Sequence, residues 1–270
     1  MTGFPLPDEL AARARDILAG RVEPVPARDA ATVVILRPGA RGPEVYLLRR
    51  KSTMAFAAGA YVFPGGSVDP RDTDMAVAWA GPSPAEWGTV FRASEQVARG
   101  LVCAAVRETF EESGVLLAGP GPESVVADTT GDDWESDRLA LIDRSLAFAD
   151  FLARRGLVLR ADLLKPWAHW ITPEIENKRF DTRFFAAVLP DGQRTRDVGG
   201  EADQVTWQRP AEAIELAQRR EIFLMPPTYH TLGELSAYDG VADVLAAPRE
   251  IVTIMPRAVE IEGEMRLVTT

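Results

Sequence analysis

One short acidic run restricts this chain more than any other part of its sequence. Residues 107–115 read Arg-Glu-Thr-Phe-Glu-Glu-Ser-Gly-Val, with Glu108, Glu111 and Glu112 at positions i, i+3 and i+4. At 3.6 residues per turn these three carboxylates share one face of a helix, and apolar residues fall on the opposite face. The run therefore predicts an amphipathic helix over Leu101–Ser113 that holds three negative charges side by side.

Two interpretations of this acidic face compete. An exposed helix tolerates neighbouring carboxylates, although they repel each other. Oxygen donors without histidine also suit hard cations such as Mg²⁺ and Mn²⁺. Three details favour a metal: Arg107 precedes Glu111 by four residues, Gly114 stands where a capping glycine belongs, and the segment Phe63-Pro64-Gly65-Gly66 lies upstream. Glycines there let bare backbone approach an ion.

Composition narrows the classes of function. The chain has 270 residues, 46% of them hydrophobic, which is enough for one large domain or two small ones. A formal net charge of -10 disfavours binding to nucleic acid or anionic membranes. Cys103 is the one cysteine, and His169 and His230 are the two histidines, so a disulfide framework and a thiolate zinc site are excluded. We see neither a membrane-spanning run nor a secretory signal, and we expect a cytoplasmic protein. Cys103 and His169 are predicted to be structural.

Apolar periodicity predicts strands mixed with helices, and hence a mixed sheet covered by helices. Strands are expected at 32–36, 45–48, 60–63, 167–171, 183–189, 204–207 and 251–255, and helices at 8–20, 101–113, 136–155, 210–220, 228–237 and 240–247. Residues 1–28 are predicted to form an N-terminal helix and lead-in, 29–258 a single domain, and 259–270 a tail. Within the domain we expect an insertion at about 73–99 and a mobile loop at about 119–133.

The acidic run resembles the second half of the signature of the Nudix hydrolase superfamily. That signature opens with a Gly, then five residues, a Glu, seven residues and the Arg-Glu run. Gly66, preceded by Gly65, matches the opening glycine, and Asp72 supplies a shortened carboxylate where the first Glu belongs. Arg107 follows Gly66 by 41 positions in place of fourteen, so 27 residues are extra.

An insertion inside the signature is similar to that of the coenzyme A diphosphatases related to the mammalian peroxisomal enzyme. Further segments carry this similarity from about residue 30 to about 255: 45–50, 54–66, 179–185 and 226–228. The resemblance implies a Nudix-type α/β/α sandwich with a helical insertion and extra C-terminal helices. It implies hydrolysis of a diphosphate linkage in a nucleoside diphosphate derivative, first of all coenzyme A or an acyl-CoA. ADP-ribose, a dinucleotide or a nucleoside triphosphate is the alternative substrate, and an inactive nucleotide-binding module is the non-enzymatic alternative.

The resemblance also implies roles for the acidic helix. Glu108, Glu111 and Glu112 would bind Mg²⁺ or Mn²⁺ together with the carbonyl of Gly65, and one of these glutamates would activate the water. Arg107 would hold a glutamate in position through a charge-assisted hydrogen bond. A further metal ligand is expected from a distant loop, with Glu201 as the first choice and Glu174 and Glu176 as competitors.

Basic residues near the glycine-rich loop supply candidates for substrate binding. Arg49, Arg50 and Lys51 are predicted to contact phosphate, or else to form an ordinary solvated turn. Arg179 and Arg183 have the same two interpretations, since Asp181 between them would make a structural ion pair. Phe63 completes the predicted substrate-binding set. The expected partner is a small nucleoside diphosphate derivative, and a homodimer is possible.

Overall fold

A nine-stranded mixed sheet forms the centre of the computed structural model, which describes residues 4–51, 57–196 and 202–269. Across the sheet the strands follow the order β12 (Phe223–Leu224), β4 (Ala60–Val62), β3 (Gly42–Arg50), β2 (Arg28–Gly39), β10 (Phe180–Val188), β9 (Lys165–Ile171) and β13 (Thr253–Ile254). Two more strands join it, β11 (Ala202–Gln208) beside β3 and β5 (Gly65–Ser67) beside β2. Because β2 runs parallel to β10 but antiparallel to β3, the sheet is mixed as predicted.

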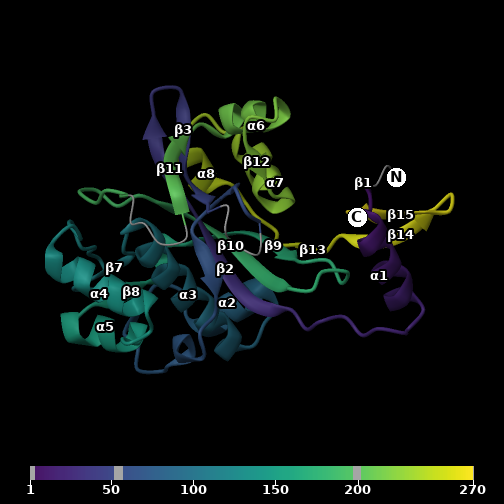
Figure 1. Ribbon diagram of the computed structural model, residues 1–270. Helices are drawn as coiled ribbons and strands as arrows, with labels where there is room; N and C mark the ends of the chain where they lie inside the picture. Colours follow the sequence, from purple (N-terminus) through teal and green to yellow (C-terminus); the bar gives the residue numbers. More distant parts are fainter. Residues whose placement is uncertain (1–3, 52–56, 197–201, 270) are drawn as a thin grey trace.

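Alternate side chains of β2 pack into two hydrophobic clusters, one on each face of this sheet. Ala31, Val33 and Ile35 join the cluster that includes the buried face of α3 (Glu95–Ser113). Val34 and Leu36 join the cluster on the opposite face. Figure 1 shows α2 (Pro84–Phe91) and α3 on one side of the sheet, and α6 (Pro210–Gln218), α7 (Pro226–Leu235) and α8 (Val241–Ala246) on the other. The predicted three-layer sandwich is confirmed.

Helix α3 is the element that the acidic run predicts, and it begins six residues before the predicted start. The hydroxyl of Ser94 accepts a hydrogen bond from the backbone N–H of Val97, which caps the helix. Gly114 ends it in the left-handed conformation, with φ of 74°. Between these two ends, α3 packs closely against Val68 at Gly100, where an added Cβ would lie 2.9 Å from a methyl group of Val68.

The insertion folds against the main sheet. A 3₁₀ turn, η1 (Pro70–Thr73), leads into the insertion, which contains β6 (Trp79–Ala80) and α2. The ring of Trp87 lies 5.7 Å from that of Phe91 and 5.5 Å from that of Phe185 in β10. β6 also joins β8 (Val158–Arg160), which pairs in turn with β7 (Ala118–Gly119) in a small separate sheet.

One predicted helix is two helices in the structure. In place of a continuous helix at 136–155, α4 (Asp132–Ile142) ends before a turn at Arg144, and α5 (Phe148–Arg155) follows. Arg144 has a positive φ of 64°, and the N–H of Leu146 bonds the carbonyl of Ala140. The apolar spacing continued across this turn, so periodicity alone did not reveal the break. In the segment before α4, which was expected as a mobile loop, Thr129 is buried and donates a hydrogen bond to the carbonyl of Gly114.

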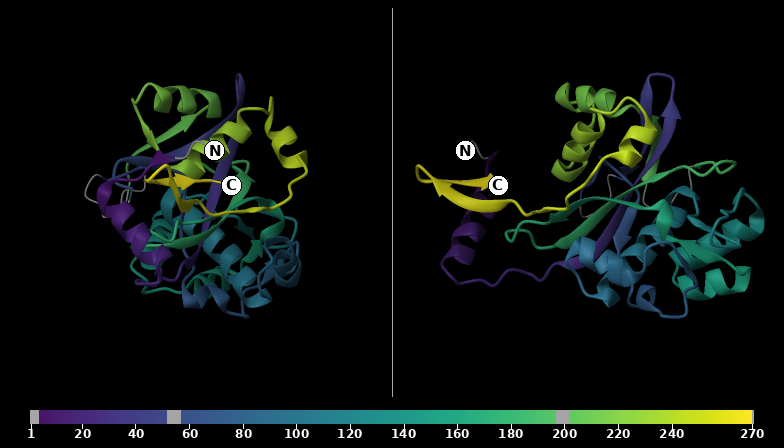
Figure 2. Two further views of the ribbon diagram at one scale, coloured as in Figure 1. Left: turned by 90° about the vertical axis from the view of Figure 1, so that its right-hand side faces the viewer. Right: turned by 180° about the vertical axis from the view of Figure 1, so that it is seen from behind.

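The two ends of the chain form a separate unit at one side of the sheet (Figures 1 and 2). It consists of β1 (Phe4–Pro5), α1 (Asp8–Leu18), β14 (Arg257–Ile261) and β15 (Glu264–Val268). β15 pairs with both β1 and β14. The segment expected as a tail is therefore mostly a hairpin, whose Met265 packs with Ala11 and Ala14 of α1. The pairing of β15 with β1 joins segments from opposite ends of the chain, so no local sequence pattern predicted it.

Cys103 and His169, for which structural roles are predicted, are both buried. Cys103 is fully buried in α3, and His169 in β9 bonds Asp181 and Thr253. Within the described ranges, no helix has both the length and the apolar character needed to cross a membrane.

Candidate active site

The guanidinium of Arg107 joins the two halves of the split signature. Its Nε and Nη2 donate to the two carboxylate oxygens of Asp72 at 3.0 and 2.9 Å. Its Nη1 donates to Glu108 at 2.8 Å and to Glu111 at 3.1 Å, and its Nη2 also bonds the carbonyl of Ser67 at 3.0 Å. The side chain of Asp72 is only 1% exposed. The shortened carboxylate before the insertion therefore reaches the helix that follows it.

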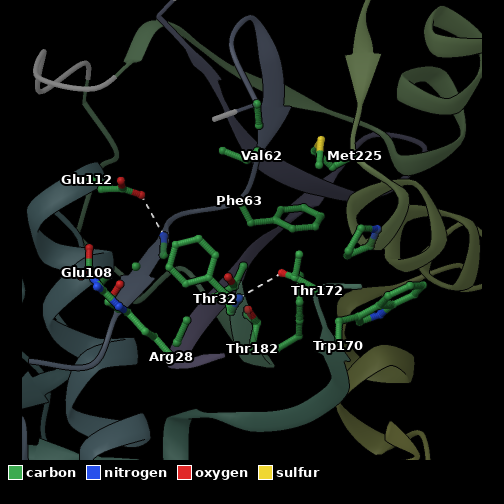
Figure 3. A pocket seen from close by; sticks show the side chains of 18 of the residues that line it. Arg28, Thr32, Val62, Phe63, Glu108, Glu112, Trp170, Thr172, Thr182 and Met225 are labelled. Atoms are coloured by element: carbon green, nitrogen blue, oxygen red, sulfur yellow. Dashed lines mark hydrogen bonds between the residues drawn. The ribbon is translucent and has the colours of Figure 1, made fainter. Parts of the chain in front are cut away.

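Two glycines bring β5 directly against the acidic face of α3. The backbone N–H of Gly65 donates to Glu112 Oε2 at 2.8 Å, as Figure 3 shows. A Cβ on Gly66 would lie 2.3 Å from Glu108 Oε1, and a Cβ on Gly65 would lie 2.5 Å from the carbonyl of Ala31. A side chain at Gly65 would meet backbone atoms, and one at Gly66 would displace the carboxylate of Glu108, which explains the Gly-Gly pair physically.

Burial sets the electrostatics of this cluster. It raises the pKa of Glu108 to about 7, even though Arg107 opposes the shift. It also raises the pKa of Glu111 and of Asp72, again against the effect of Arg107. One guanidinium does not compensate three largely buried carboxylates, and a bound divalent cation would relieve the remaining repulsion.

The donor chemistry fits a hard cation, since Glu108, Glu111 and Glu112 on the acidic face offer carboxylate oxygens. Among the described residues, no set of three or more Asp, Glu, His or Cys side chains has the arrangement of a complete metal site. Glu201, the predicted distal ligand, lies outside the described residues. Of its competitors, Glu176 lines the same cavity as the acidic face and Glu174 does not. The predicted metal ligand at Gly65 is its carbonyl oxygen, whereas the contact of Gly65 with Glu112 is made by its N–H.

The raised pKa of Glu108 predicts how stability depends on pH without metal. The folded protein keeps this proton between about pH 4.5 and pH 7, where the unfolded chain has lost it. The free energy of unfolding therefore falls as the pH rises through this window, with a contribution from Glu108 on the order of 3 kcal/mol. Denaturant unfolding in a chelator, compared between wild type and Glu108→Gln, measures this contribution. Parallel pH profiles for the two proteins would contradict the prediction.

A cavity of about 720 Å³ extends from the acidic face across the sheet. Arg50 and Phe63 of the predicted substrate-binding set line it, together with Glu108, Glu111 and Glu112. Four further cationic residues line it that the sequence did not single out: Arg28, Arg71, Arg144 and Lys178. They come from four separate segments, so only the folded chain reveals that they share one cavity.

The other predicted cations lie elsewhere. Arg49 forms an ion pair with Asp203 at 2.6 Å beside a second hollow, and Lys51 is exposed. Arg179 is buried and donates to the carbonyls of Val25 and Thr172. Arg183 is also buried and pairs with Asp29 and Asp181, which is the structural alternative weighed for it. None of these four residues lines the cavity of the acidic face.

The fold and the site together define a class of protein. A glycine-rich strand beside the Arg-Glu-x-x-Glu-Glu helix, at the edge of a mixed sheet between helical layers, is the arrangement of a Nudix hydrolase. A family model described as the NUDT19 Nudix domain matches residues 89–235, more than half of the chain. The chain therefore belongs to this family of Nudix hydrolases, whose members generally need a divalent metal ion.

Individual proteins agree with this assignment. The chain is 26% identical to the acyl-coenzyme A diphosphatase NUDT19 of Gallus gallus, over 80% of this chain and 70% of that protein. It is 28% identical to the protein of the same name from Xenopus laevis, over 71% of this chain and 59% of that one. The crystal structure of a NUDIX hydrolase from Alicyclobacillus acidocaldarius superposes with a TM-score of 0.71, at 29% identity over 84% of this chain and 98% of that chain. The predicted family and fold are confirmed.

Proposed function

We propose that this protein hydrolyses the diphosphate linkage of coenzyme A or an acyl-CoA, giving 4′-phosphopantetheine, or its acyl form, and 3′,5′-ADP. The observation that carries the proposal is the largely buried carboxylate cluster, in contact with a glycine-rich strand at one end of a long cavity that cations line. The names of the relatives from Gallus gallus and Xenopus laevis support the choice of coenzyme A.

The acidic face supplies the metal ligands in this proposal. Glu108, Glu111 and Glu112 would hold Mg²⁺ or Mn²⁺, and the ion would supply charge neutralisation on the diphosphate and activation of a water molecule. Arg107 acts as a positioning residue, because its Nη1 bonds Glu108 and Glu111 while Asp72 fixes the guanidinium from the other side. The backbone N–H of Gly65 orients Glu112 in the same way.

Cationic side chains around the cavity bind the phosphates of the substrate. Arg144 lines the cavity beside the acidic face, and its charge opposes the raised pKa of Glu111. Arg28 begins β2 and lines the cavity close to β5, whose Ser67 pairs with Ala30. Coenzyme A carries a diphosphate and a separate 3′-phosphate, so cations at more than one point suit it.

Product analysis tests the proposed function. Incubation of coenzyme A with the protein and Mg²⁺ or Mn²⁺ is expected to give 4′-phosphopantetheine and 3′,5′-ADP in equal amounts, separated by chromatography. A chelator should stop the reaction, because the carboxylates are themselves negatively charged and cannot neutralise the diphosphate without the metal ion. ADP-ribose, a dinucleotide and a nucleoside triphosphate serve as comparison substrates. Cleavage of ADP-ribose without cleavage of any CoA species would refute the proposed substrate, and binding without any cleavage would indicate a nucleotide-binding module.

A further inference from the structure

The floor of the cavity is built by a regular alternation in two neighbouring strands. In β2, Arg28, Ala30 and Thr32 line the cavity, and in β10 Phe180, Thr182 and Phe184 do so. The parallel pairing sets these residues opposite one another in three rows, 28 with 180, 30 with 182 and 32 with 184. Because alternate side chains of a strand point to the same face of a sheet, these six residues form one continuous stripe that faces the cavity.

The middle row of this stripe consists of small side chains, and each row beside it contains a larger one, Phe180 or Phe184. The central row joins Ala30 and Thr182, two small side chains, and it continues to Ser67 of β5 on one side and Trp170 of β9 on the other. We call these four residues the trough. Figure 3 shows the glutamates at one end of the cavity and Trp170 at the opposite end, with Thr32 and Thr182 between them.

The side of the trough near Trp170 is mainly apolar, and it holds a buried hydrogen-bond donor without a partner. Phe63, the N-cap residue Met225 and the first residues of α7, Pro226–Thr228, line this part of the cavity. Trp170 is 5% exposed, and its indole N–H has no hydrogen-bond partner among the described residues. A buried N–H without a partner is costly, so a small movement of the ring that brings this N–H to a carbonyl group of a bound ligand would be favoured.

We propose that the trough binds the amide-bearing chain of the substrate, with its acyl or thiol end against Trp170. This inference rests on the proposed function, because it takes the diphosphate to lie at the acidic face. Four strands spaced about 4.8 Å apart cover about 14 Å, the reach of about twelve extended chain atoms. The chain of 4′-phosphopantetheine from its phosphate to its sulfur has about this length and carries two amides, which match the hydroxyl of Thr182 and the N–H of Trp170.

Filling the trough tests the proposal. Thr182→Leu places a larger side chain in the middle of the trough, whereas Thr182→Val keeps its size. Binding of 4′-phosphopantetheine and of 3′,5′-ADP is measured separately by titration calorimetry, so that turnover is not needed. The leucine variant should bind 4′-phosphopantetheine at least about tenfold more weakly and 3′,5′-ADP unchanged within about twofold. Thr206→Leu, the same exchange in β11 outside the cavity, is the matched control, and thermal unfolding verifies that each variant is folded.

A second variant isolates the hydrogen bond of Trp170. Trp170→Phe keeps an aromatic ring and removes the N–H, and it should weaken 4′-phosphopantetheine about three- to tenfold without changing 3′,5′-ADP. Wild-type affinity for 4′-phosphopantetheine in both Thr182→Leu and Trp170→Phe, or an equal loss of both ligands, would overturn the trough assignment. If wild type cleaves coenzyme A in these cases, the proposed function still stands. A wild type that neither cleaves coenzyme A nor binds 4′-phosphopantetheine would overturn both.

Discussion

Replacement of Glu111 or Glu112 by glutamine is expected to lower kcat by at least about 100-fold while the protein stays folded. Both side chains line the cavity on the acidic face of α3. Glutamine keeps the size of each side chain and removes its negative charge, so it binds a divalent cation poorly. The oxygen of a glutamine at 112 still accepts the hydrogen bond from the Gly65 N–H, and the local contact is preserved.

A control on the same helix separates the loss of a ligand from a general loss of charge. Glu95 lies in the first turn of α3, is exposed and does not line the cavity. Glu95→Gln should keep the activity of wild type within about twofold, since an exposed surface charge has little effect. Steady-state rates at saturating Mg²⁺, with thermal unfolding of each variant, give the comparison. Full activity in both the Glu111 and the Glu112 variant would show that the metal site lies elsewhere.

Removal of the Arg107 side chain is expected to lower the free energy of unfolding by about 3–5 kcal/mol. Arg107→Met leaves Asp72 with a side chain that is 1% exposed and without the bidentate partner that offsets its burial. The same change removes the donor that Glu108 and Glu111 share. Three buried carboxylates then face one another, and each lost hydrogen bond to a charged group adds to the cost.

A double-mutant cycle attributes this effect to the pair. Asp72→Asn removes the charge that Arg107→Met leaves uncompensated, so the double variant should recover part of the lost stability. Arg21→Met is the matched control, because Arg21 pairs with Asp16 on the surface, where both side chains are largely exposed, and a change below about 1 kcal/mol is expected. Chemical denaturation measures all of these free energies. Equal effects at Arg107 and Arg21 would mean that the buried network does not stabilise the fold.

The same network explains how the site tolerates its insertion. Asp72 lies in η1 before the inserted segment, and Arg107 lies in α3 after it. Asp72 also accepts from the N–H of Asp69, which caps the 3₁₀ turn. A buried ion pair thus joins the segment before the insertion to the helix that follows it.

Local sequence signals predicted most of the helices and the chemistry of the acidic face. The 3.6-residue period of the run at 107–115 and the glycine at its end require only neighbours in the chain, so α3 and its three glutamates followed directly. The sequence also identified Gly65 and Gly66, and through the family resemblance it linked them to the acidic face. Where the local signal continued through a turn, as at Arg144, the sequence misplaced a boundary.

Tertiary structure alone decided which distant side chains share the cavity. Arg179 and Arg183 were candidates for the substrate because they are cationic, but burial and pairing with Val25, Thr172 and Asp29 give them structural roles. Arg28 entered the site because β2 pairs with β10, a contact between segments about 150 residues apart. The register of such pairing depends on packing of the whole sheet, which no local pattern encodes. The sequence by itself therefore determined the kind of bond that the acidic face is suited to cleave, and the fold decided which residues surround the rest of the substrate.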